Sequence, residues 1–201
     1  MTGMYAQLVP AIIEHGPALY EATRHADDLW LWMGDGPYAN LEDFGATWKK
    51  KVDAADAVFY TVLMAGNPVG YASLMRIDHL NGCVEVGNIM YSPILKQTPA
   101  ATEVQYLLAR YVFDSLGNRR YEWKCNSLNL PSRRAALRYG FEFEGVFRQH
   151  MIIKGKNRDT AWFAMLDSEW PSRKRAFEAW LDPLNFEDDG RQKKPLTYFR
   201  E

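Results

Sequence analysis

Three side chains in this sequence are candidates for proton transfer: Glu85, Ser132 and His150. An imidazole has an unperturbed pKa of about 6.5, so His150 suits the exchange of a proton near neutral pH. A carboxylate such as Glu85 can accept a proton, and a serine hydroxyl can donate one. The three residues therefore offer an acid and a base for a group-transfer reaction.

Each candidate also has an ordinary structural explanation. His150 fits a surface or core histidine, and Glu85 fits a solvated strand residue paired with a neighbouring Arg or Lys. Asn129 and Ser132 stand three residues apart at the start of a predicted helix, so Asn129 fits an N-cap that Ser132 completes. The residue types alone leave both explanations open.

Charge and composition exclude several classes of function. Lysine and arginine number 24 against 25 acidic residues, and this balance argues against nucleic acid as a partner. Charges interrupt every apolar stretch well short of a membrane span, and no signal pattern opens the chain, so we expect no membrane partner and a cytoplasmic location. Cys83 and Cys125 lack metal-binding spacing, so we expect reduced thiols and no metal.

Helical spacing dominates the N-terminal part of the chain, and strands follow it. Apolar residues recur at helical spacing over residues 13–33, and a second helix is expected over residues 42–51 with Asn40 as its cap. Strands are expected over residues 57–64, 69–77 and 83–91, joined by turns into an antiparallel meander. Gly87 inside the third strand predicts a bulge or a close backbone approach.

The second half of the chain alternates helices with strands. We expect a loop over 92–101, helices over 102–116 and 131–139, and strands over 120–125, 143–153 and 160–166. A short helix after Pro171 leads to a tail from about Asp182 that we expect to be loosely ordered. This order predicts an α/β domain with a mixed sheet over residues 1–170, followed by a C-terminal helix and tail extension over 171–201.

The run from Asn129 to Phe141 (NLPSRRAALRYGF), with Arg148 to Gly155 after it, carries a family resemblance. It resembles the N-x-x-S-x-x-x-x-x-x-x-G-F block and the R-x-x-x-x-x-x-G segment of the ribosomal-protein-type (Rim-like) branch of the GNAT superfamily of acyl-CoA N-acyltransferases. The match keeps its order from about Tyr60 to Trp170, which makes it more specific than a short motif. It implies the GNAT fold: a mixed, mostly antiparallel central sheet with splayed central strands and helices on both faces.

The resemblance implies acetyl-CoA as a co-substrate, bound at a loop of the pattern Q/R-x-x-G-x-G/A before a helix. Lys96 takes the basic position, and Pro99 stands where the pattern usually has Gly, so the loop is atypical. Such loops hold a pyrophosphate with backbone N–H groups and the positive end of the helix dipole. Pro99 supplies no N–H. The remaining contacts are expected from Gln97, Thr98, Ala100, Ala101 and Thr102.

In the family, the pantetheine arm lies between the last strand of the meander and the next parallel strand. The resemblance therefore places backbone N–H groups near Ile89, Met90 and Tyr91 against the acetyl carbonyl. It also makes Asn129 the residue that orients the cofactor arm and Ser132 the proton donor to the leaving thiolate.

Basic residues that follow Asn129 are candidates for the adenosine phosphates. Arg133-Arg134 and Arg138 can supply the charge-assisted bonds that phosphates favour. A solvated helix face is the alternative. Arg158-Asp159, further along, is expected to form a fixed pair that shapes a turn.

The base that strips the amine, directly or through water, is expected to be Glu85 or His150. Related ribosomal enzymes tend to carry an acidic residue where this chain has His150-Met151, so the base and the substrate both stay open. The N-terminal helical region forms one wall of the acceptor site in the family. Its aromatic residues either pack in the core or line that wall: Trp30, Trp32, Tyr38 and Trp48.

Taken with the resemblance, the residues predict an N-acetyltransferase that moves an acetyl group from acetyl-CoA to a primary amine of a small molecule or a protein N-terminus. The alternative is a non-catalytic module on the same fold that binds acyl-CoA or a partner. Dimerisation through an exposed strand edge or the C-terminal extension is a further option.

Overall fold

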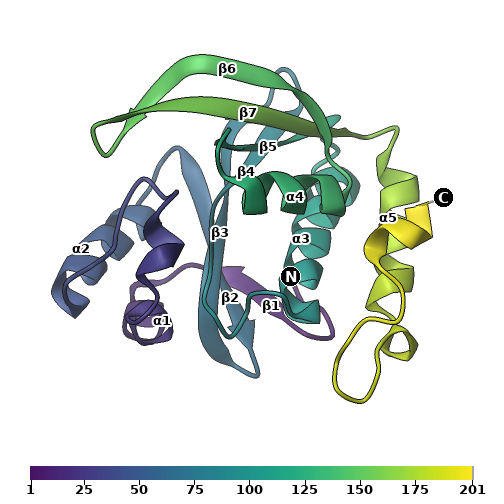
Figure 1. Ribbon diagram of the computed structural model, residues 1–201, viewed down its shortest axis with the longest axis horizontal. Helices are drawn as coiled ribbons and strands as arrows, with labels where there is room; N and C mark the ends of the chain where they lie inside the picture. The colour runs from purple at the N-terminus through teal and green to yellow at the C-terminus, as the bar shows by residue number, and fades with distance from the viewer. Residues whose placement is uncertain (201) are drawn as a thin grey trace.

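A seven-stranded sheet, in the order β1-β2-β3-β4-β5-β7-β6, runs through the centre of the molecule (Figure 1). The computed structural model describes residues 1–200. The β4–β5 pair is parallel and the other neighbouring pairs are antiparallel. The strands are β1 (Gln7–Pro10), β2 (Ala57–Met64), β3 (Asn67–Asp78), β4 (Cys83–Tyr91), β5 (Arg120–Asn126), β6 (Glu142–Ile153) and β7 (Lys156–Leu166).

Helices cover both faces of this sheet, and each begins at a residue suited to a helix start. Asn40 caps α2 by accepting a hydrogen bond from the Asp43 amide, as the sequence predicted. Gly140 ends α4 in the left-handed conformation, with φ of 98°. The α-helices are α1 (Gly16–Thr23), α2 (Leu41–Val52), α3 (Pro99–Arg110), α4 (Leu130–Tyr139) and α5 (Trp170–Leu181). Shorter helical turns are η1 (Ile13–His15), η2 (Asp27–Trp30), η3 (Tyr111–Ser115, a π-helix), η4 (Pro183–Asn185) and η5 (Leu196–Arg200).

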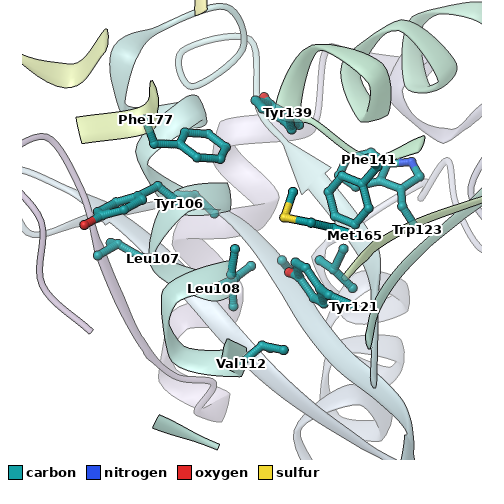
Figure 2. Close-up of a cluster of buried hydrophobic side chains, with 14 of the residues drawn as sticks. Tyr106, Leu107, Leu108, Val112, Tyr121, Trp123, Tyr139, Phe141, Met165 and Phe177 are labelled. Atoms are coloured by element: carbon teal, nitrogen blue, oxygen red, sulfur yellow. The ribbon is translucent and has the colours of Figure 1, made fainter. Parts of the chain in front are cut away.

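The larger hydrophobic core lies between the sheet and the helices α3, α4 and α5. Figure 2 shows part of it, where Tyr121 and Trp123 of β5 lie near Phe141 and Met165, with Phe177 of α5 across the cluster. The indole of Trp123 and the ring of Phe141 are 5.7 Å apart at their centroids. Helix α5 therefore shares the core of the sheet.

A smaller core covers the opposite face, where α1 and α2 pack on β2, β3 and β4. Trp30, Phe44 and Trp48 are almost completely buried there against Tyr71 of β3 and Met90 of β4. Core packing, the alternative considered for Trp30 and Trp48, is therefore confirmed. The burial of these large aromatic rings stabilises the α1–α2 unit more than the burial of its other side chains does.

The two parallel strands pair over only four residues each, from Cys83 to Val86 and from Arg120 to Trp123. Strand β4 nevertheless continues to Tyr91, and β5 continues to Asn126 while it stays paired with β7. The strands therefore separate beyond Val86, as the splayed central strands of the prediction require. We call the space between residues 87–91 of β4 and residues 124–126 of β5 the strand gap.

The β6–β7 hairpin extends beyond the sheet toward the α1–α2 side (Figure 1). At its tip the Nζ atom of Lys154 donates a hydrogen bond to the carbonyl oxygen of Trp30, over 2.7 Å. The hairpin is thus fastened to η2, and the sheet face near the strand gap is bordered by the hairpin and by the α1–α2 unit.

The C-terminal tail differs from the expectation that it is loosely ordered. Leu196 is buried, and the Asn185 side chain bonds to the carbonyl oxygens of Trp180 and Lys194. The Trp180 indole also donates to Gln192 over 2.8 Å. The prediction was wrong because the tail's polar composition hides a few buried anchors that hold it against α5.

No helix within residues 1–200 has the length and apolar character needed to cross a membrane.

Candidate active site

Three strands of the sheet, β3, β4 and β6, carry bulges, and each bulge contains a non-glycine residue with positive φ. These residues are Arg76 in β3 (φ 48°), Asn88 in β4 (φ 50°) and Gln149 in β6 (φ 51°). The strand register shifts at each position. Such a conformation costs an L-residue roughly 1 to 2 kcal/mol, and bulges often re-aim side chains next to active sites. The predicted irregularity at Gly87 is confirmed one residue later, at Asn88.

Glu85 of β4 lies buried at the centre of an ion-pair network on the sheet face that α1 and α2 cover elsewhere. Its Oε2 atom is 3.0 Å from Nζ of Lys124 and 3.2 Å from Nε of Arg76. Lys124 also pairs with Glu122 over 2.7 Å. Burial raises the pKa of Glu85 above its ordinary value, and the nearby Lys124 and Arg76 partly oppose that rise. The expected pairing of Glu85 is confirmed, but the residue is buried instead of solvated.

His150 follows the β6 bulge, and its Nδ1 atom lies 3.0 Å from Oγ1 of Thr160 on β7. Desolvation is the largest cause of the lowered pKa of His150, and the positive charges of Arg76, Arg158 and Lys124 lower that pKa further. Its imidazole is therefore neutral at pH 7 and can accept a proton. An open hollow of about 520 Å³ borders the neighbouring residues Arg148 and Gln149.

Glu85 and His150 belong to one electrostatic site, because both interact with Arg76 and Lys124. The ring of Trp162 joins them: its centroid is 3.6 Å from Nζ of Lys124 and 6.0 Å from that of His150. A cation this close to an indole face is held by a cation–π interaction.

Sequence reasoning missed Lys124 and Arg76. The sequence did contain a signal for Lys124, because Glu122 and Lys124 are two apart on β5 and residues two apart share a face of a strand. Arg76 gave no signal, because the bulge that aims it depends on the register with β4.

Asn129 and Ser132 lie at the N-terminus of α4, next to the end of β5. The Asn129 side chain accepts a hydrogen bond from the Ser132 amide over 3.1 Å, which confirms that Asn129 caps the helix. The Ser132 hydroxyl accepts a hydrogen bond from Nε1 of Trp123 over 3.0 Å. A hydroxyl that accepts can still donate its own proton elsewhere. Capping by Asn129 and donation by Ser132 are therefore compatible.

Arg133, one residue further, donates to the carbonyl oxygen of Ser127 over 3.1 Å and packs over the ring of Phe143. These contacts fix the guanidinium near the start of α4. The nearby Arg138 instead reaches the start of α3, where it donates to Oγ1 of Thr102 over 3.0 Å.

Helix α3 begins three residues before the predicted start at Thr102. Thr98 is its cap, accepting a hydrogen bond from the Ala101 amide over 3.2 Å, and Pro99 is its first residue. The fixed φ of proline suits this position, and the missing N–H is one that the helix itself would not use. Pro99 therefore forms part of a regular helix start, which the loop pattern of the sequence concealed.

The side chains around this helix start are small and buried, and the loop before it is strained. Ala100 and Ala101 are both buried. Gln97, which precedes the cap, is exposed and has φ of 61°. The N-terminus of α3 thus presents backbone donors without large side chains over them, a geometry that suits an anion.

Ile89, Met90 and Tyr91 lie on β4 beyond the last residue paired with β5. Met90 is buried in the α1–α2 core, and the Tyr91 hydroxyl accepts a hydrogen bond from Gln105 over 2.6 Å. Alternate backbone groups of this segment face the strand gap, where β5 no longer pairs with them. An extended, hydrogen-bonding chain such as a pantetheine arm fits a gap of this kind, and the α3 start fits its phosphates.

Within residues 1–200, no group of three or more His, Cys, Asp or Glu side chains is placed to hold a metal ion.

The sheet opens between two parallel strands, a helix begins at one end of the gap, and ionisable side chains lie beside it. This arrangement suits an acyltransferase. The sequence bears this out, since residues 7–142 match the family described as the acetyltransferase (GNAT) domain. The chain belongs to that family, and acetyl transfer is its general chemistry.

Known proteins resemble this chain along much of its length. A crystal structure of a GCN5-related N-acetyltransferase from Brucella melitensis is 48% identical and superposes with a TM-score of 0.97, covering 99% of this chain and 92% of that one. A candidate GNAT-family acetyltransferase from Chromobacterium violaceum ATCC 12472 is 36% identical with a TM-score of 0.81, covering 85% and 87%. A Bacillus subtilis (strain 168) protein named as a candidate ribosomal N-acetyltransferase, YdaF, is 24% identical over 149 residues, covering 72% of this chain and 80% of its own. The similarity to the Rim-like branch is therefore confirmed.

Proposed function

We propose that this protein moves an acetyl group from acetyl-CoA to a primary amine by direct attack. The observation that carries the proposal is the strand gap with ionisable groups on one side, Glu85 and His150, and the Ser132 hydroxyl on the other. Acetyl-CoA, when bound, supplies the thioester carbonyl that the amine attacks.

The residues of this chain divide the work of the reaction. The segment Gln97, Thr98, Ala100, Ala101 and Thr102 at the start of α3 holds the phosphates. The amides of Thr98 and Ala101 already bond within the segment and to Leu95, so the donors are those of the other three residues. Arg133, at the start of α4, adds a positive charge. Within the segment Ile89, Met90 and Tyr91, the backbone N–H groups that face the strand gap hold the acetyl oxygen and stabilise the negative charge that develops on it. Asn129 orients the cofactor arm from the start of α4.

Proton transfer falls to three side chains. His150 is neutral at pH 7 and bonds through Nδ1 to Thr160, which leaves Nε2 to take a proton from the amine, directly or through water. The buried Glu85 is the second candidate for this base. Ser132 gives its hydroxyl proton to the departing sulfur.

Calorimetric titration with acetyl-CoA, with ATP as the control, tests the cofactor assignment. We expect saturable binding of acetyl-CoA and markedly weaker binding of ATP, because the strand gap accepts the pantetheine arm that ATP lacks. Absence of acetyl-CoA binding would contradict the proposal and favour a module that binds a different partner.

Replacing Ser132 with Ala tests the proton donor. We expect kcat to fall about 100-fold, the range typical of general acid catalysis, while the Kd for acetyl-CoA changes less than about twofold, because the Asn129 cap uses the backbone amide of residue 132. Ser168→Ala, in an exposed turn after β7, is the matched control. A large loss of affinity with unchanged kcat would make Ser132 a binding residue only.

A further inference from the structure

Arg158 of β7 is a half-buried guanidinium that lacks a protein partner. Its Nε atom is buried and makes no hydrogen bond within residues 1–200, and its guanidinium makes no ion pair there. The expected pair with Asp159 is absent, because Oδ1 of Asp159 accepts hydrogen bonds from the Gln149 amide and from Nδ2 of Asn157. A buried donor without an acceptor is uncommon and costly, so its retention calls for an explanation.

Arg158 lies at the site that contains His150 and Glu85. Its positive charge acts on the imidazole of His150, and it interacts with the charges of Glu85 and Arg76. It shares a face of β7 with Thr160, the hydrogen-bond partner of His150, since the two residues are two apart in the strand. The guanidinium is therefore next to the place where the acceptor amine must lie.

The charges at this site do not balance. Four cations, Arg76, Lys124, Arg120 and Arg158, face three carboxylates, Glu85, Glu122 and Glu144, while His150 is neutral at pH 7. Arg76, Lys124 and Arg120 are engaged by these carboxylates, so Arg158 carries the charge in excess. One uncompensated cation matches one negative charge.

A second buried donor on the same face has no acceptor. Nε1 of Trp162 makes no hydrogen bond within the described part of the chain, although Lys124 packs against its ring. Oε2 of Glu85, although ion-paired with Lys124 and Arg76, is an acceptor at this site that makes no hydrogen bond, so two unpaired donors stand against one acceptor. A ligand with acceptor oxygens would correct both the donor count and the charge.

The geometry points to an acceptor amine that carries a carboxylate, bound by the guanidinium of Arg158 while the amine is presented to His150. This inference rests on the proposed acetyl transfer and adds the class of acceptor. A guanidinium binds a carboxylate through two parallel N–H···O bonds, which fixes orientation as well as position. A monoanion satisfies the single excess charge better than a doubly charged phosphate does.

The acceptor is a small molecule on this account, because the site is enclosed on opposite sides. The β6–β7 hairpin borders one side and is tied to η2 by the hydrogen bond from Lys154 to Trp30. The α1–α2 unit borders the other (Figure 1). A small amino acid, or a compound that ends in one, carries both the amine and the carboxylate that this account requires.

The test compares ω-amino acids of increasing methylene length with the matching ω-amino carboxamides, which keep the amine and remove the charge. Release of free thiol from acetyl-CoA gives kcat/KM for each compound. We expect the best acid to exceed its amide at least about tenfold, in line with loss of a charge-assisted bond. In Arg158→Gln that ratio should fall to about one, and Arg158→Lys should restore part of it. Arg191→Gln, an exposed arginine of the C-terminal tail, should keep the wild-type ratio.

A binding measurement makes the test independent of turnover. The N-acetyl derivatives of the same compounds cannot react further, so their affinity can be measured in the presence of CoA. The wild type should bind the acid more tightly than the amide. Arg158→Gln should lose this preference. Circular dichroism and the Tm establish that each variant is folded.

Acids and amides that bind or react equally well would overturn the inference, as would an acid preference that survives Arg158→Gln. Failure of every acid to bind a protein that does bind acetyl-CoA would also overturn it. Failure to bind acetyl-CoA at all contradicts the proposed function instead, so the two failures are distinguishable.

Discussion

Burial moves the pKa values of His150 and Glu85 in opposite directions and therefore toward each other. It lowers the pKa of His150 from 6.5 and raises that of Glu85 from 4.5, because the charged form of each group is the one that desolvation penalises. Each group accepts a proton only above its own pKa and loses that ability as the pH falls through it. An acidic limb in the pH profile is expected from both, so the wild-type profile alone does not identify the base.

His150→Gln and Glu85→Gln separate the two candidates. We expect kcat/KM of the wild type to decline on the acid side below pH 6.5. In His150→Gln that limb should disappear and kcat/KM at neutral pH should fall about 100-fold, the usual contribution of a general base. His79→Gln, an exposed histidine between β3 and β4, is the control. If the limb persists in His150→Gln and disappears in Glu85→Gln, the base is Glu85.

Residue types and spacing offered candidates for proton transfer, but they could not predict how those side chains are held. Glu85 and His150 were identifiable because a titratable group in a strand is conspicuous. The contacts of Glu85 with Arg76 and Lys124 join residues on three different strands, so no local pattern reveals them. The role of Arg158 depends on a missing partner, which is a property of the folded chain.

Among the elements, α3 connects the cofactor end of the molecule to the N-terminal segment. Glu103 is buried in α3, and its carboxylate accepts hydrogen bonds of 2.7 Å from the backbone amides of Met4, Tyr5 and Ala6. Hydrogen bonds to a charged group are stronger than neutral ones. This carboxylate therefore accepts the backbone hydrogen bonds that a neighbouring strand would otherwise accept from the segment before β1.

Glu103→Ala should destabilise the protein by roughly 3 kcal/mol, because it leaves buried amides without an acceptor. Chemical denaturation measures the loss. The matched control is Glu178→Ala, since that exposed carboxylate accepts a single hydrogen bond from Tyr106 and should cost less than about 1 kcal/mol. Equal effects of the two substitutions would show that the N-terminal segment contributes little to stability.

Turn residues made the strand boundaries predictable, and Asn40 and Asn129 were predicted as caps, while the start of α3 and the tertiary anchors did not follow from the pattern. Strands β2 and β4 have the predicted bounds, since Gly, Asn and Pro stand next to them. The start of α3 was placed too late because Pro99 suits both a loop and the first turn of a helix. The bulges at Arg76 and Gln149 depend on the register with a partner strand, which one sequence does not specify.

At the scale of the whole molecule, four residue pairs join the two parts of the sheet, β1–β4 and β5–β7. A ligand in the strand gap would contact both parts, so its binding should stabilise the folded state as a whole. Acetyl-CoA at about 100 times its Kd should add roughly 2.7 kcal/mol and raise the Tm by about 5 to 10 °C. Scanning fluorimetry, with ATP at the same concentration as the control, measures this shift. A rise of the same size with ATP would place the ligand outside the gap.

The chain passes from β1–β4 to the rest of the sheet once, through residues 92–98, where Pro93 and Ile94 are exposed. A break between these two residues would leave β1–β4 with α1 and α2 in one fragment, and α3 with β5–β7 in the other. Neither fragment could bury its share of the larger core alone, because that core includes residues from both. The protein is thus suited to fragment complementation, in which reassembly of two separately made pieces would itself report on occupancy of the gap between them.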